Sequence, residues 1–479
     1  MKQYRLPILL LFCVLSPYNA ATELPDIGIS ANTVMSPADE QKLGEAFLRQ
    51  LRREMEVMDD PQINNYINAL GNRLASYSNN PEQHFRFFIV KEPSINAFAI
   101  PGGFIGIHSG LILKTHSESE LASVLAHEIA HITQRHIARI IEASQRLTLP
   151  AIAALIAAAV IAASASNPNI GQAAIAAITA GNAQMQINFT RTHEIEADHL
   201  GMQILAKAGF KPRDMPNFFK RLQAANRHYG KIPEFLRTHP VTTNRIAEAH
   251  ERAEKYPRKK MGDTPFYHLI KAKILVLTTD DKEKLLKTLK NMLKTGNYRD
   301  ERATRYALAL TLLATRKIEG LQTQINWLFK NDGDRIAYHL LKARLALLQN
   351  NTAKAMQEYE QSLEIYPGDK TLGLDYAEKL LQNNSPRKAK AVLLKISASS
   401  NPYYYYLLAK AYQLTGERAQ AHLAYAENYY LKGETALALE QIKLARQQNK
   451  LNFYLASRID ARYKELQAEL LEEQKVSSP

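Results

Sequence analysis

The sequence predicts a mainly α-helical protein, in which a first domain with a small β-sheet precedes an α-solenoid of repeated helix pairs. Two observations predict this fold class. An aromatic and β-branched stretch between residues 85 and 107 interrupts long segments of helical periodicity. The C-terminal half repeats with a period of about 34 residues, which is typical of stacked helix-turn-helix units. We expect a leader over residues 1–20 and two domains over residues 21–257 and 258–479.

The composition indicates a globular chain without thiol chemistry in its body. Of the 479 residues, 46% are hydrophobic and 23% are charged, which is a normal globular mixture. The single cysteine, Cys13, lies close to the N-terminus, so we expect neither a disulfide nor a thiolate metal site beyond it. Any metal ion must therefore be bound by His, Asp or Glu.

The N-terminal segment has the pattern of an export signal. Lys2 and Arg5 precede an apolar run from Leu6 to Leu15, and small residues around Ala20 offer a cleavage point. The run is too short to span a bilayer comfortably. We therefore predict an exported protein whose signal peptide occupies residues 1–20.

The net charge of +14 is concentrated in the second half of the chain. From Arg258 onward there are 36 Lys and Arg residues against 24 Asp and Glu residues. This excess suits a solvated helical surface, or a face for acidic partners or anionic lipid headgroups with peripheral membrane contact. We expect no nucleic acid as a partner, because the chain is predicted to be exported and carries no nucleic-acid-binding motif.

Two helices and a strand region make up the first part of the predicted first domain. Ser36 starts a helix that runs to about Val57, and a second helix is expected from Pro61 to Tyr77. Residues 85–90 suit a strand, and residues 96–107 predict two short strands around a Pro-Gly-Gly turn. We expect a sheet of roughly three or four strands.

Three further segments follow the strands. Residues 117–120 form a capping box that opens a helix expected to continue to about Ser144. Residues 147–165 are alanine-rich, and we interpret them as a buried helix or a mobile lid over a cleft, with a membrane span as the alternative. The next helix is expected from about Thr190 to Ala208, where Gly209 ends it.

The second half is predicted to be a series of helix pairs. Residues 338–367 and 376–402 each form a pair that closes with a proline, and Asn350, Asn384 and Gly416 occupy comparable turns. Such units stack into a superhelix with a concave groove for peptides or partner proteins, and a generic helical bundle is the alternative. Divergent pairs are also expected at residues 266–293 and 302–329.

The chemistry of the chain is concentrated in an H-E-x-x-H motif at residues 127–131, within a predicted helix. The spacing of four places His127 and His131 on one face about one turn apart, so both imidazoles can reach one metal ion. Glu128 lies beside them and can take the proton of a water molecule. The alternative is a pair of surface histidines, but Glu128 shares its face with apolar side chains, where an unpaired carboxylate would be costly.

A second helix offers the third ligand that a catalytic metal ion needs. Glu194 and Asp198 are four residues apart and align with Gly201 and Leu205 on the apolar side of that helix. Solvated acids normally face the other way, as we expect of Glu196. We therefore predict that Glu194 completes the site with one position left for water, with a bystander role as the alternative.

An H-E-x-x-H motif followed far along the chain by E-x-x-x-D resembles the gluzincin metallopeptidases related to the CAAX prenyl protease and the heat-shock membrane protease. The Asn-Ala-Phe-Ala-x-Pro-Gly-Gly run at residues 96–103 is similar to that family as well. The repeats resemble tetratricopeptide repeats. With its export signal, the chain most closely resembles periplasmic members of the family that act on outer-membrane β-barrel proteins.

The resemblance implies that His127, His131 and Glu194 bind one Zn²⁺ and that Glu128 is the general base. Asp198 matches the second carboxylate of the family, which donates a proton or orients a ligating histidine. We favour the orienting role, because metal-bound imidazoles need an acceptor for their other N–H group.

The resemblance also implies a latch. In the most similar relatives, a histidine in a loop after the third ligand contacts the zinc ion and holds the enzyme latent. His239 matches that position, and an ordinary loop residue is the alternative. Arg245 nearby is expected to stabilise an oxyanion.

A substrate strand is expected to pair with an edge strand near residues 98–107, with Phe98, Gly102, Gly103 and Ile105 at the contact. Pairing of this kind reads extended backbone rather than sequence, so unfolded or misassembled proteins would satisfy it.

The implied function is that of a periplasmic zinc endopeptidase and chaperone. It would degrade misassembled outer-membrane proteins, promote the assembly of others, and contact the β-barrel assembly machinery through its repeats. One alternative is a repeat-based chaperone or adaptor with a latent metal site. Another is a membrane-embedded protease that uses residues 147–165 as its span.

Overall fold

The computed structural model describes residues 36–142, 183–229, 234–258, 262–396, 400–449 and 451–477. The predicted signal peptide and the apolar segment 147–165 lie outside these residues. Within the described part, no helix is long and apolar enough to cross a membrane.

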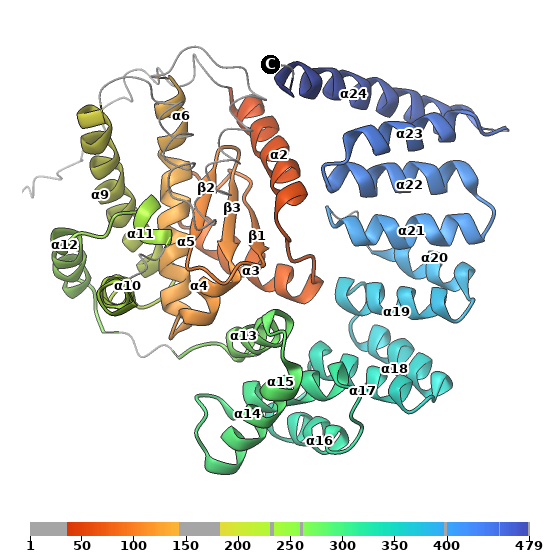
Figure 1. Cartoon of the computed structure of the whole chain (residues 1–479), viewed down its shortest axis with the longest axis horizontal. Helices are drawn as coiled ribbons and strands as arrows, with labels where there is room; N and C mark the ends of the chain where they lie inside the picture. Colours follow the sequence, from red (N-terminus) through yellow and green to blue (C-terminus); the bar gives the residue numbers. More distant parts are fainter. Residues whose placement is uncertain are drawn as a thin grey trace, which may run out of the picture.

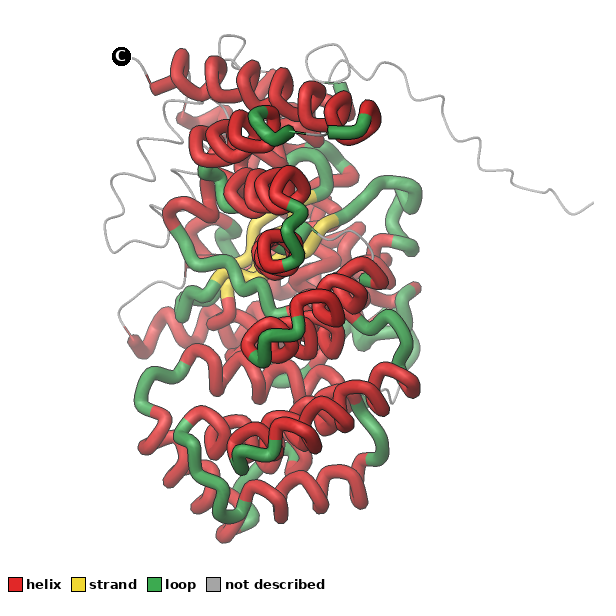
Figure 2. Tube along the Cα trace, turned by 90° about the vertical axis from the view of Figure 1, so that its right-hand side faces the viewer, coloured by secondary structure: helices red, strands yellow, loops and turns green. Residues whose placement is uncertain are grey.

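The predicted fold class is confirmed. A helical domain with a small sheet is followed by a solenoid that curves beside it from α13 to α24 (Figure 1). The rotated view in Figure 2 shows the solenoid helices stacked above one another, with the sheet at mid-height. The last helix returns to the first domain, where Glu473 pairs with Arg53 of α2 at 2.9 Å and Glu469 pairs with Arg49.

The sheet has three strands in the order β1-β3-β2: β1 (Arg86–Val90), β2 (Ala97–Ile100) and β3 (Phe104–His108). Strand β1 is parallel to β3, whereas β2 is antiparallel to β3 with Phe98 opposite Gly106. The Pro-Gly-Gly turn between β2 and β3 is as predicted. The prediction that Ile105 lies on an edge strand is wrong, because β3 is the central strand and is paired on both sides.

Glycine is required in the β2–β3 turn. Gly102 has a φ of +82°, and a Cβ atom there would lie 2.4 Å from the carbonyl oxygen of Glu40 in α2. We expect Gly102→Ala to lower the free energy of unfolding by about 1–3 kcal/mol, because strain and a backbone clash combine. The urea midpoint measures this. Gly262→Ala is the control, because a Cβ atom at Gly262 meets nothing within 4 Å, and an equal loss in both variants would contradict the expectation.

The sheet lies between helices on its two faces, because successive strand residues point to opposite sides. On one face, Phe88, Phe98 and Phe104 pack against Phe47 and Leu51 of α2 (Pro37–Glu54). On the other face, the alternate strand residues pack against α3 (Pro61–Ala75) and α5 (Glu118–Thr133). A capping box at Ser36 starts α2, and Asp60 caps α3.

The helix that carries the H-E-x-x-H motif is shorter than predicted. It ends at Thr133 instead of continuing to about Ser144, and a separate helix, α6 (His136–Glu142), follows after a short break. Arg135 between them has a φ of +52° and donates its guanidinium N–H groups to Glu40 at 2.7 and 2.9 Å. This contact with α2 stabilises the break.

Five further helices complete the described part of the first domain. Gly209 ends α9 with a φ of +89°, as predicted, although α9 begins earlier than expected. The helices are α4 (Ser109–Lys114), α9 (Ala183–Lys207), α10 (Asp214–Tyr229), α11 (Glu234–Thr238) and α12 (Thr243–Glu254).

The solenoid consists of consecutive helix pairs, as predicted. Asn350, Asn384 and Gly416 occupy equivalent turns with positive φ values of 60°, 51° and 84°. Its first helix also joins the core of the first domain, through Tyr267 and Ile270. The helices are α13 (Pro265–Thr278), α14 (Lys282–Thr295), α15 (Glu301–Ala314), α16 (Leu321–Asp332), α17 (Ile336–Leu348), α18 (Thr352–Ile365), α19 (Lys370–Gln382), α20 (Pro386–Lys395), α21 (Pro402–Leu414), α22 (Arg418–Leu431), α23 (Thr435–Arg446) and α24 (Phe453–Ser477).

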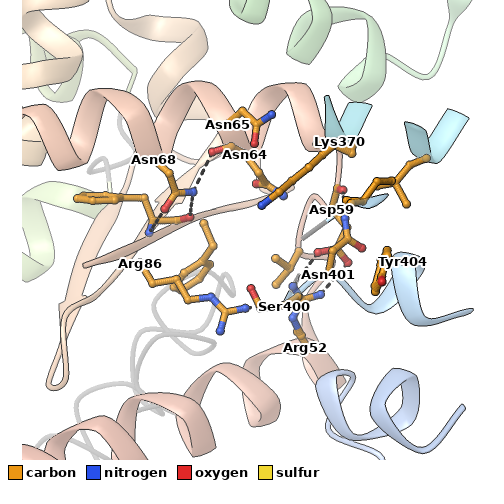
Figure 3. A pocket seen from close by; sticks show the side chains of 16 residues that line it. Arg52, Asp59, Asn64, Asn65, Asn68, Arg86, Lys370, Ser400, Asn401 and Tyr404 are labelled. Carbon is orange, nitrogen blue, oxygen red and sulfur yellow. Dashed lines mark hydrogen bonds and ion pairs between the residues drawn. The ribbon is translucent and has the colours of Figure 1, made fainter. Parts of the chain in front are cut away.

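A polar cavity of about 240 Å³ separates β1 and α3 from α19 and α21 (Figure 3). At its rim, Arg52 forms a two-bond ion pair with Asp59 at 2.7 and 2.8 Å, and Asn401 donates to the backbone oxygen of Asp59. Arg86 donates to the backbone oxygen of Ser400 at 3.3 Å. The hydrogen bonds of Asn401 and Arg86, together with the contacts of α24, hold the solenoid against the first domain.

Candidate metal centre

Helix α5 places both histidines of the motif on one side. Ser117 caps the helix by accepting a hydrogen bond from the backbone N–H of Glu120. The Nε2 atoms of His127 and His131 lie 3.0 Å apart. Helix α9 packs closely against this segment because Gly201 has no side chain, and a Cβ atom there would lie 3.0 Å from the backbone nitrogen of His127.

Helix α9 brings a carboxylate to the two imidazoles. Glu194 is 3% exposed, and its oxygens lie 3.4 Å from Nε2 of His127 and 3.2 Å from Nε2 of His131. Nδ1 of His239 lies 2.9 Å from the same carboxylate. The structure therefore brings His127, His131, Glu194 and His239 together, and their ligand atoms all lie within 4.8 Å of one another.

This cluster fits a tetrahedral metal ion. Bonds of about 2.0–2.1 Å at tetrahedral angles separate the ligand atoms by roughly 3.4 Å, close to the distances between these four side chains. Two neutral Nε2 atoms at 3.0 Å would face each other with lone pairs if both were unprotonated, and a cation between them removes that repulsion. The donor set of nitrogen and carboxylate oxygen without sulfur is one that a divalent zinc-like ion accepts.

His239 occupies a defined position because its loop is anchored. The backbone N–H of Phe235 in α11 donates to the backbone oxygen of Ile95 just before β2, at 2.9 Å. The buried ring of Phe235 stacks on His239 with centroids 4.8 Å apart. His239 therefore takes the fourth position around the cluster, which a catalytic metal ion keeps for water.

Glu128 lies beside the cluster but outside its ligand set. It is fully buried, and among the described residues neither of its oxygens accepts a hydrogen bond. Nε2 of His239 lies 3.4 Å from Oε1 of Glu128. A buried carboxylate that accepts no hydrogen bond is costly, so Glu128 indicates a task in chemistry rather than in stability.

Asp198 and Arg245 support the ligands. Oδ1 of Asp198 lies 3.0 Å from Nδ1 of His127, the nitrogen that faces away from the cluster. Arg245 forms two bonds to Asp198 at 2.8 and 2.9 Å, pairs with Glu194 at 2.8 Å and donates to the backbone oxygen of Pro240 at 2.7 Å. All three guanidinium nitrogens of Arg245 thus bind the two carboxylates and the loop of His239, and its expected oxyanion role stays a prediction.

The electrostatics keep the carboxylates ionised. Burial favours the neutral form of His127, but Asp198 and Glu194 outweigh it and raise the pKa of His127 to about 10. Burial lowers the pKa of His131. Burial opposes ionisation of Glu194, yet His239 and the hydrogen-bonding imidazoles hold the pKa of Glu194 well below its usual range. An ionised carboxylate is the form that binds a metal ion.

Two residues that lie at the site, His136 and Glu196, were not predicted from the sequence to belong to it. His136 lies with its Nδ1 atom 2.8 Å from Nδ1 of His131, and its Nε2 atom lies 3.1 Å from Glu196. Burial lowers the pKa of His136 to about 2, so its ring is neutral. Glu196 was expected to face solvent, and it does so only in part. The only sequence signal was the short distance of His136 from the motif.

The expected substrate strand is only partly placed as predicted. Strand β2, which contains Phe98, is an edge strand, and among the described residues its outer side has no strand partner. The side chain of Phe98 is buried, and Gly102 and Gly103 lie in the turn. Only the backbone of β2 is therefore left to receive an extended chain.

Comparisons with known proteins agree with this geometry. Residues 61–253 match the model of peptidase family M48, and residues 346–411 match a tetratricopeptide repeat. The chain is 34% identical to the β-barrel assembly-enhancing protease of Escherichia coli, over 94% of this chain and 92% of that protein. It is 35% identical to the putative β-barrel assembly-enhancing protease of Vibrio cholerae, over 97% and 98% of the two chains. The mitochondrial metalloendopeptidase OMA1 of Schizosaccharomyces pombe is 30% identical over 39% of this chain and 52% of its own. The chain therefore belongs to peptidase family M48 and is a metallopeptidase homologous to the β-barrel assembly-enhancing proteases, with tetratricopeptide repeats.

Proposed function

We propose that this metallopeptidase is a periplasmic zinc endopeptidase that cleaves unfolded or misassembled outer-membrane β-barrel proteins. The observation that carries the proposal is the convergence of His127, His131, Glu194 and His239 beside the buried Glu128. The names of the relatives support the substrate class, since those proteins are proteases that enhance β-barrel assembly. The predicted signal peptide supports export.

Each residue near the metal centre has a proposed role. His127, His131 and Glu194 bind zinc, which when bound supplies a Lewis acid that polarises a peptide carbonyl and acidifies water. Glu128 takes the proton of the attacking water and returns it to the leaving nitrogen. Asp198 accepts the Nδ1 proton of His127, and so keeps Nε2 free for the metal.

His239 is proposed to hold the enzyme latent. Its imidazole lies where the attacking water must be, so peptide cleavage requires the loop around Phe235 and Pro240 to move. Because Arg245 binds both the ligand Glu194 and the backbone of Pro240, it links the loop to the metal centre.

We expect His239→Ala to raise the rate of peptide cleavage severalfold while zinc stays bound, because three protein ligands remain and the fourth position opens. The rate on a fluorogenic unfolded substrate and the zinc content measure this. Thr238→Ala is the neighbouring control, since that side chain is exposed and contacts no ligand. A His239→Ala enzyme that holds zinc but stays as slow as wild type would refute the latch.

The substrate is proposed to add to the outer edge of β2. Backbone pairing selects extended chains without requiring a sequence, which suits a protease for unfolded proteins. The repeats are proposed to contact the β-barrel assembly machinery. The positive charge of the second half would also favour peripheral contact with anionic membranes. We further propose that the protein acts as a chaperone that promotes the assembly of other outer-membrane proteins.

Purified protein tests the function against the alternative of a repeat-based chaperone with a latent metal site. The zinc-loaded enzyme should cleave a denatured outer-membrane β-barrel protein and spare the same protein folded in detergent. The zinc-free enzyme should cleave neither. If a protein without peptidase activity fully restored outer-membrane integrity in a strain that lacks this protein, the chaperone alternative would be supported instead.

A further inference from the structure

One metal ligand is connected to a chain of polar side chains that the proposed mechanism does not use. Nδ1 of His131 lies 2.8 Å from Nδ1 of His136, and Nε2 of His136 lies 3.1 Å from Oε2 of Glu196. His136 is 2% exposed, and its ring stacks on His193 with centroids 4.0 Å apart and planes 7° apart. The stacking on His193 and the contacts of both ring nitrogens therefore hold the imidazole of His136 in one orientation.

The break after α5 creates this contact. In an uninterrupted helix a residue five positions after His131 would be rotated by roughly 140° away from it. The left-handed backbone of Arg135 interrupts the helix instead, and the ion pair of Arg135 with Glu40 stabilises that conformation. The imidazole of His136 is thereby turned back onto His131.

The positions of the protons follow from the geometry. To bind a metal ion, His131 must present the lone pair of Nε2, so its proton lies on Nδ1. That N–H group can donate only to an unprotonated Nδ1 of His136, which places the proton of His136 on Nε2. The Nε2–H group then donates to the carboxylate of Glu196. With these proton positions, the side chains of His131, His136 and Glu196 are all hydrogen-bonded. The same arrangement leaves Nε2 of His131 free to bind a metal ion.

We propose that His136 is a positioning residue that holds His131 in the tautomer able to bind the metal ion, with Glu196 fixing His136 in turn. The proposal rests on zinc binding by His131. It gives the two motif histidines different supports: His127 faces the carboxylate of Asp198 directly, whereas His131 reaches a carboxylate through a second imidazole. Supports of this kind orient a ligand and raise its basicity.

Two substitutions at position 136 separate positioning from packing. His136→Asn keeps a side-chain carbonyl at about the place of Nδ1, whereas His136→Leu fills similar space without an acceptor. We expect His136→Leu to weaken zinc binding by about 10- to 100-fold, and His136→Asn to recover most of that loss. Competition with a chelator measures the zinc affinity. The visible spectrum of the cobalt(II)-substituted protein should likewise shift in the leucine variant and return towards wild type in the asparagine variant.

Controls make the result decisive. His199→Asn changes an exposed histidine of α9, which is hydrogen-bonded to Gln203, and should leave the zinc affinity unchanged. The zinc-free forms of both His136 variants should unfold at similar temperatures. The proposal is overturned if His136→Leu binds zinc like wild type, or if both variants lose the same affinity. A wild-type protein that binds no zinc would overturn the proposed function as well, so the two failures are distinguishable.

Discussion

Glu128→Gln is expected to lower the rate of peptide cleavage by about 10³-fold or more and to leave zinc bound. General-base catalysis contributes on the order of 10²–10⁴-fold, and an amide cannot take the proton of water. Neither oxygen of Glu128 belongs to the ligand cluster, so metal binding does not depend on it. Cleavage of a denatured β-barrel protein and zinc content, measured on the same preparation, test both parts.

The variant should fold normally. Glutamine has nearly the same shape as glutamate, and it removes a fully buried carboxylate that accepts no hydrogen bond in the described part of the chain. The thermal midpoint of Glu128→Gln should therefore equal or exceed that of wild type. Glu251→Gln, on the exposed side of α12, is the matched control for the loss of one charge. Cleavage at the wild-type rate by Glu128→Gln would remove Glu128 from the mechanism.

Local periodicity explains which parts of the site could be predicted from the sequence. Residues four apart on a helix share a face whatever the tertiary fold, so the pairs His127 with His131 and Glu194 with Asp198 were predictable. The same holds for the turns at Asn350 and Asn384, because each repeat forms its own turn. These predictions needed only short-range geometry.

The features that were missed depend on distant contacts. The helix break at Arg135 uses no glycine or proline, and it is held by Glu40 from the other face of the sheet. Because the sequence does not predict this break, it does not predict that His136 contacts His131. Similarly, the bonds of Arg245 to Glu194 and Asp198 could not be predicted, because the two carboxylates belong to another helix. The central position of Ile105 follows from strand order, which the sequence pattern does not specify.

Glu194→Ala is expected to remove most of the bound zinc, with an affinity loss of at least about 100-fold, or about 2.7 kcal/mol. The carboxylate is the one acidic group whose oxygens reach His127, His131 and His239 in the described part of the chain. Removing it takes one negative charge away from three imidazoles and the cation of Arg245, which keeps its ion pair with Asp198. The remaining positive charge close to the cluster disfavours a metal ion there.

Asp198→Asn is the matched comparison, because this substitution also removes one buried negative charge from α9. Like Glu194, Asp198 contacts Arg245. Its side chain supports His127 and does not enter the ligand cluster, so we expect a smaller loss of about 10- to 100-fold. Zinc content after dialysis against a graded series of chelators ranks the two variants. If Glu194→Ala kept one zinc ion per chain while Asp198→Asn lost it, the third ligand would be Asp198. If neither variant lost zinc, the metal ion would lie elsewhere, and the catalytic role proposed for Glu128 would lose its basis.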